Sequence, residues 1–250
     1  MTDSITGEHR MIVADTRGHL EPSDLQLVLL LLAGGSAVAH RRWERRLAQE
    51  GPGPLLDAPE LAERLLAVRT LLAPSEALFL YVMVRHALRA EGVDDADLAD
   101  YLAALLLAFG QRDRAWRVDW NDDQRHRYLV DIVADLDQTE GDRRFKVMAH
   151  LGNYALWLAG VFPDYIAARR VRRGGPGLSY YDSLGRRGYA LAAEHALADR
   201  MGLEAVFRTA AERYPDVRGA LTTLSDRVFF PNVVTDDRLA RARHRRDGMR

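Results

Sequence analysis

The residues best suited to chemistry lie in one short stretch beyond the middle of the chain. On a helix, His150, Asn153, Tyr154 and Trp157 fall at spacings of three, four and seven residues, so they share one face. The residues around them, from 147 to 162, are almost all apolar, which indicates a polar and aromatic stripe in a largely buried helix. Imidazole, amide and phenol groups in such a place can bind a polar ligand, and histidine is the usual general base near neutral pH.

A second segment, from 179 to 189, contributes further tyrosines. Buried polar groups need hydrogen-bond partners, and this segment can supply them through Tyr180, Tyr181, Asp182 or Tyr189. Glycines in both segments would let the two helices approach closely. Two interpretations stay open: a small pocket between the helices, or a satisfied polar network that fixes their register. The candidate ligand-binding residues are His150, Asn153, Tyr154, Trp157, Tyr180, Tyr181 and Tyr189.

The sequence offers little for a metal or a cofactor. His195 and Asp199 lie one helical turn apart and are the nearest approach to a ligand pair, but such pairs are common on helix surfaces. A four-helix di-iron site needs a Glu-x-x-His pair on each of two helices, and this spacing is absent. Without cysteine there is no thiolate zinc site, iron–sulfur cluster or cysteine nucleophile. We therefore expect no metal, with His195 and Asp199 as weak candidates, and no cofactor.

Arginine takes the place of lysine almost everywhere, and Lys146 is the one exception. This bias is typical of a GC-rich bacterial genome and weakens any argument from arginine clusters. A net charge of −1 gives no global field that would attract nucleic acid. A glycine- and arginine-rich connection at 169–177 is the most obvious break between helices. Its arginines form a weak candidate anion-binding site: Arg169, Arg170, Arg172 and Arg173.

Apolar residues recur three and four positions apart along most of the chain, which predicts an all-α fold. We expect a single irregular bundle of roughly eight to ten helices around the segments 76–90 and 143–162. The helical domain spans 23–234, with a weak subdivision near the polar stretch 111–121, whose tryptophans we expect to pin it to the body. Residues 1–22 form an N-terminal extension, and the charged residues 235–250 form a flexible tail.

The composition predicts a soluble cytoplasmic protein. Apolar residues make up 48% of the chain and charged residues 28%, and no signal peptide is visible. The most apolar stretch, 25–39, falls short of the roughly 20 apolar residues that a membrane-spanning helix needs. We therefore expect no membrane insertion.

No P-loop, dinucleotide-binding, nucleophile-elbow or zinc-protease motif is present, so the sequence favours a protein that is not an enzyme. The leading hypothesis is a helical interaction protein, an adaptor or accessory subunit, that binds a protein partner or itself. The apolar segment 25–32 is its candidate surface. The first alternative is a small-molecule-binding protein or metal-dependent enzyme, with its pocket between the helices that carry His150 and Tyr181. The second is a nucleic-acid-associated protein that uses its arginine clusters.

Overall fold

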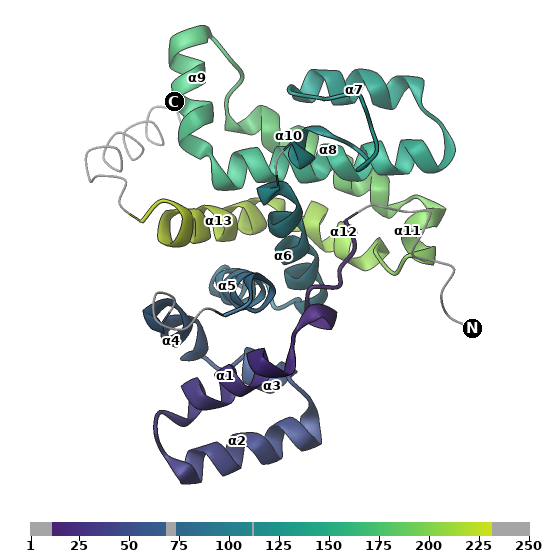
Figure 1. The fold of residues 1–250 in the computed structure, drawn as a ribbon. Coiled ribbons are helices and arrows are strands. Elements are labelled where there is room, and N and C mark those ends of the chain that lie inside the picture. The colour runs from purple at the N-terminus through teal and green to yellow at the C-terminus, as the bar shows by residue number, and fades with distance from the viewer. Residues whose placement is uncertain (1–11, 69–73, 112, 232–250) are drawn as a thin grey trace. The chain divides into compact units, whose positions relative to one another are not determined.

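The computed structural model describes residues 12–68, 74–111 and 113–231 (Figure 1). In these residues all regular structure is helical, so the predicted all-α class is confirmed. The described residues form thirteen α-helices, more than the eight to ten that the sequence predicts. They also contain two short 3-10 turns, η1 (Arg17–His19) and η2 (Arg114–Trp116), and a π-helical segment, η3 (Ser225–Phe229). The predicted tail, 235–250, lies outside the described residues.

The chain divides into two compact units after Gln111. The N-terminal unit comprises residues Ile12–Gln111, and the C-terminal unit contains the described residues 113–231. Each unit has its own buried apolar residues. In the described part of the chain no helix is both long enough and apolar enough to cross a lipid bilayer.

The N-terminal unit contains the first six helices: α1 (Pro22–Ala33), α2 (Ala37–Glu50), α3 (Gly53–Leu56), α4 (Leu61–Val68), α5 (Glu76–Ala90) and α6 (Ala96–Gly110). Local sequence sets their ends. Gly34 adopts a left-handed conformation (φ 55°) that ends α1, so the apolar run breaks into two helices. The Ser75 hydroxyl accepts the backbone N–H of Leu78 at 3.0 Å and begins α5. The Asp95 carboxylate begins α6 in the same way.

A buried arginine ties the loops of this unit to α5. Arg85 is 4% exposed, and its Nε and Nη2 donate to the two carboxylate oxygens of Asp57, each at 2.8 Å. It also donates to Asp94, which precedes α6. These bonds to a charged donor lower the pKa of the Asp57 carboxyl below its usual range. The side chain therefore holds two loops against one helix.

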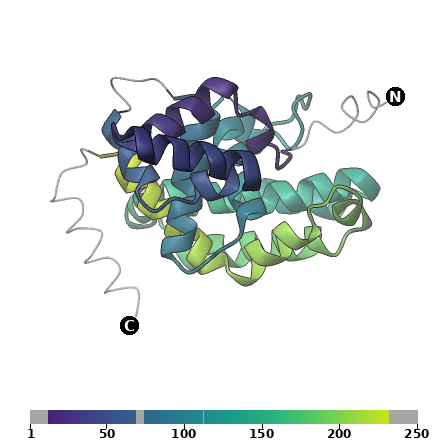
Figure 2. The same ribbon diagram turned by 90° about the horizontal axis from the view of Figure 1, so that it is seen from below.

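The C-terminal unit contains seven helices: α7 (Leu129–Gln138), α8 (Gly141–Val161), α9 (Pro163–Arg173), α10 (Leu178–Ala193), α11 (Ala196–Arg200), α12 (Glu204–Glu212) and α13 (Tyr214–Leu224). The 21-residue α8 lies at its centre, packed against α7, α10 and α13. Figure 2 shows α8 in teal with the yellow-green helices near the C-terminus running alongside it.

Helices α8 and α10 touch through their backbones. A Cβ atom on Gly188 of α10 would lie 2.5 Å from the backbone nitrogen of Gly152 and 2.8 Å from the carbonyl oxygen of Met148. A Cβ on Gly152 would lie 2.7 Å from the Tyr189 ring. Only glycine fits at these two positions, so the glycines permit the close approach that the sequence suggested.

The segment before α7 is held to α8 by ion pairs. Asp119 pairs with Lys146 at 2.5 Å, and Asp122 pairs with Arg143 at 2.7 Å. The sequence predicted that tryptophans would anchor this segment, but Trp120 is exposed. Trp116 does contact the body, because its side chain hydrogen-bonds to Tyr154 of α8 and its ring lies under the Arg127 guanidinium, 5.0 Å from ring centroid to Cζ. The ion pairs and Trp116 together attach the segment to α8, and Arg127 and Tyr128 follow it directly before α7.

Candidate functional site

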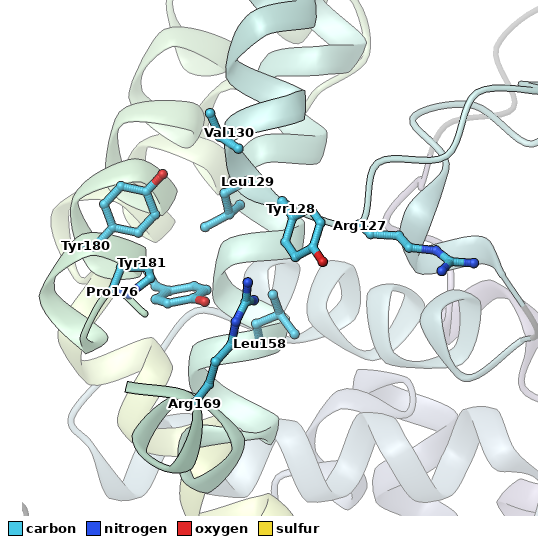
Figure 3. A pocket seen from close by; sticks show the side chains of 9 residues that line it. All are labelled: Arg127, Tyr128, Leu129, Val130, Leu158, Arg169, Pro176, Tyr180 and Tyr181. Atoms are coloured by element: carbon cyan, nitrogen blue, oxygen red, sulfur yellow. The ribbon is translucent and has the colours of Figure 1, made fainter. Parts of the chain in front are cut away.

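A cavity of about 300 Å³ opens in the C-terminal unit, where the ends of several helices meet (Figure 3). Its volume is at the lower limit of the range for small-molecule pockets, about 300–1,000 Å³. The walls come from the start of α7, the last turns of α8 and α9, and the first turn of α10. The lining residues are Arg127, Tyr128, Leu129, Val130, Leu158, Arg169, Pro176, Tyr180 and Tyr181.

The chain path between α8 and α10 creates this cavity. Pro163 begins α9 directly after α8, because its ring fits the first turn of a helix but not the interior. Gly174, in a left-handed conformation (φ 62°), ends α9, and its N–H bonds to the carbonyl oxygen of Arg170 at 3.1 Å. The glycine- and proline-containing link up to Gly177 then leads into α10. Arg169 and the tyrosine pair of α10 are thereby brought to the same opening.

Arg169 is the charged group of the cavity. Its guanidinium reaches from α9 toward Tyr128 and Tyr181 and lies 4.9 Å from the centroid of the Tyr128 ring (Figure 3). No described residue forms a hydrogen bond or ion pair with its side chain. The other lining arginine, Arg127, directs its side chain away from the other lining side chains and onto Trp116. No carboxylate is present among the nine lining residues, so the cavity has a positive character.

The tyrosines supply neutral hydrogen-bonding groups. Tyr181 is 4% exposed, and burial raises the pKa of its phenol although the nearby Arg169 opposes this. The phenol therefore stays protonated near neutral pH and can donate a hydrogen bond. Figure 3 shows its hydroxyl directed toward Arg169. The Tyr180 ring stands perpendicular to it, with centroids 5.7 Å apart, so the two rings form an aromatic corner.

Of the seven residues predicted for the pocket, Tyr180 and Tyr181 line the cavity and the other five do not. His150, Tyr154 and Trp157 form a row of stacked rings on α8, with centroids 5.9 and 6.0 Å apart. The Tyr154 hydroxyl donates to the carbonyl oxygen of Arg127 at 3.0 Å, and burial raises its pKa to about 12. Tyr154 does not line the cavity, but its hydrogen bond fixes the backbone of Arg127 and so helps to position Tyr128 in the cavity wall.

Asn153 and Tyr189 lie in the core between α8 and α10. The Tyr189 hydroxyl donates to Oδ1 of Asn153 at 2.8 Å, and both side chains are buried. This bond links the two helices next to their glycine contact. His150 is also buried, and burial holds the pKa of its imidazole well below the ordinary value. The ring is therefore neutral at physiological pH.

Of the two weak metal candidates, His195 has a structural role. His195 begins α11, where its Nδ1 accepts the backbone N–H of Leu197 at 3.2 Å and its ring stacks on Phe145. Asp199 is exposed on the same short helix. In the described residues no group of three or more His, Cys, Asp or Glu side chains is arranged to hold a metal ion.

The predicted anion-binding arginines do not lie in a loop. Arg169, Arg170, Arg172 and Arg173 belong to the last turns of α9, because the left-handed Gly174 ends the helix only after them. Arginines are favourable there, since cations complement the negative end of the helix dipole. Arg169 enters the cavity, whereas the other three are exposed.

Sequence reasoning missed most of the cavity wall. Tyr128, Leu158 and Pro176 belong to three separate segments. Periodicity along one helix cannot show that they meet. Comparison with family models, with curated proteins and with solved structures finds no match to this chain.

Proposed function

We propose that the C-terminal unit binds a small organic molecule in the cavity between α7, α9 and α10. The observation that carries this proposal is the Arg169 guanidinium, which faces an opening of about 300 Å³ without a hydrogen-bond or ion-pair partner among the described residues. Aromatic and aliphatic side chains form the rest of the wall, the usual composition of a ligand pocket with a few orienting polar groups.

A cavity-filling substitution tests the proposal. Leu158→Trp places a large side chain at the cavity wall, and Val171→Trp adds the same group at an exposed position on α9 that does not line the cavity. A set of small aromatic and aliphatic compounds would be screened against each variant by ligand-observed NMR. We expect compounds that bind the unmodified protein to be lost with Leu158→Trp and kept with Val171→Trp. Binding that survives Leu158→Trp would place the site elsewhere.

A second candidate function is the interaction protein that leads the sequence hypotheses. Leu30 and Val38 favour it, because they are 62% and 71% exposed on either side of the turn between α1 and α2. The rest of the predicted surface supports it less, since Leu29 and Leu32 are buried in the N-terminal unit. Aspartate at Leu29 or Leu32 would therefore unfold the unit rather than disrupt an interface.

Self-association through this pair has a direct test. If the protein is an oligomer by light scattering coupled to size-exclusion chromatography, the double variant Leu30→Asp and Val38→Asp should run as a folded monomer of about 28.2 kDa. An oligomer that is unchanged in the double variant would reject this surface. Nucleic-acid binding stays a prediction of the sequence.

A further inference from the structure

The charges around the cavity indicate an anionic ligand. Among the nine lining residues, Arg169 alone directs a cationic side chain toward the opening, and two neighbouring carboxylates already have partners. Asp131 accepts the backbone N–H of Tyr128 at 3.3 Å, and Asp182 on α10 pairs with Arg218 at 3.0 Å. A partly enclosed guanidinium without its own counterion favours a ligand that brings one.

The donors that face the opening suit a planar oxyanion with a single charge. The guanidinium presents a planar fork that matches the two oxygens of a carboxylate, and the Tyr181 hydroxyl points toward the same space (Figure 3). A phosphate monoester brings nearly two negative charges. Here only one cationic side chain of the nine lining residues faces it, and the Asp131 carboxylate already accepts the N–H of Tyr128, the residue before α7. The single negative charge of a carboxylate therefore matches the single positive charge of Arg169 better than a phosphate monoester does.

The rest of the wall suits a flat apolar group. The perpendicular rings of Tyr180 and Tyr181 form two sides, and Leu129, Leu158 and Pro176 supply aliphatic surface. Aromatic rings pack favourably in such corners, both edge-to-face and offset-stacked. Since the cavity holds only about 300 Å³, it has room for one ring and a short side chain rather than a large cofactor.

We infer that the cavity binds an aromatic monocarboxylate, with its carboxylate on Arg169 and the Tyr181 hydroxyl and its ring against Tyr180. This inference rests on the proposed function and names the chemical class of its ligand.

The experiment compares carboxylates with neutral amides that have the same carbon skeleton. Phenylacetate and 3-phenylpropionate would be titrated against the full chain by calorimetry, beside phenylacetamide, 3-phenylpropionamide and phenyl phosphate. We expect at least one carboxylate to bind tenfold or more tightly than its own amide and than phenyl phosphate. An amide or the phosphate that binds as tightly as the carboxylates would overturn the inference.

Three variants locate the interaction. Arg169→Gln should weaken carboxylate binding at least tenfold and leave amide binding unchanged, whereas Arg170→Gln, one residue along α9 and exposed, should change neither. Tyr181→Phe keeps the ring and removes the hydroxyl, so we expect a smaller loss of about fivefold. Equal losses for Arg169→Gln and Arg170→Gln would overturn the assignment. Circular dichroism and thermal unfolding confirm that each variant is folded.

The failure of this inference is distinguishable from failure of the proposed function. If neutral aromatic compounds bind as well as carboxylates and Leu158→Trp abolishes both, the ligand class is wrong and the cavity is still a binding site. If no compound binds, or binding survives Leu158→Trp, the cavity is not the site and both proposals fail.

Discussion

Replacement of Gly188 by alanine tests the packing at the centre of the C-terminal unit. The added Cβ would lie 2.5 Å from the backbone nitrogen of Gly152, about 0.9 Å short of an ordinary contact of 3.4 Å, and 2.8 Å from the Met148 carbonyl oxygen. Both neighbours are backbone atoms of α8, so no side chain can rotate away. The two helices must separate, which loosens every contact between them.

The magnitude follows from two opposing effects. Alanine in a helix interior is favoured over glycine by up to about 1 kcal/mol, whereas overpacking of a tight core costs typically about 1–3 kcal/mol and occasionally more. Because rigid backbone lies on the far side of the contact, we expect the upper part of that range. The net loss in the free energy of unfolding should be about 2 kcal/mol.

Urea unfolding followed by circular dichroism measures this loss, with Gly110→Ala as the matched control. Gly110 is also helical, at the end of α6, and a Cβ there would meet no atom within 4 Å. The control should be neutral or slightly stabilised. If Gly188→Ala behaves like Gly110→Ala, the close approach of α8 and α10 is refuted.

For three further substitutions, the structure predicts the direction of the change in stability. Burial lowers the pKa of His150 in the folded protein. As the pH falls below about 6.5, this imidazole therefore gains a proton in the unfolded chain but not in the folded one, and the free energy of unfolding should fall. His150→Phe should flatten this part of a stability–pH curve measured by urea unfolding, and an unchanged slope would contradict the assignment. Tyr189→Phe removes the bond to Asn153 and should cost about 1 kcal/mol in the same assay, whereas no loss would show that the bond contributes nothing. Arg85→Met breaks a pair whose partner Asp57 is partly exposed, so a loss of about 2 kcal/mol in the N-terminal unit is expected, and a stabilised variant would contradict it.

Local signals in the sequence predict where several of the long helices begin and end. The segment 76–90 is predicted and observed as one helix, because Ser75 caps its start and Gly92 follows its end. The number of helices is less predictable. Helices α3 and α11 contain four and five residues, which is too short for an apolar period to be visible.

The site is harder to predict than the fold for a physical reason. Spacing shows that His150, Asn153 and Tyr154 share a face of α8, but it does not show which neighbour covers that face. Asn153 meets Tyr189 in the core, whereas Tyr154 meets the backbone before α7. Arg169 was predicted to lie in a connection, since glycines follow it, yet the helix continues to Arg173. Such outcomes depend on contacts between distant segments.

The contacts that stabilise the α8–α10 core and the residues that line the cavity lie in different places. The α8–α10 core is held by the glycine contact and by the bond between Tyr189 and Asn153, and neither lines the cavity. The cavity wall, in contrast, consists of helix ends, with Arg169 in the last turns of α9 and Tyr181 in the first turn of α10. Leu129 and Tyr181 in this wall are each 4% exposed and also contribute to packing, whereas Arg169 is only partly buried. Substitution of Arg169 should therefore change binding with little effect on the α8–α10 core, whereas substitution of Leu129 or Tyr181 should change both.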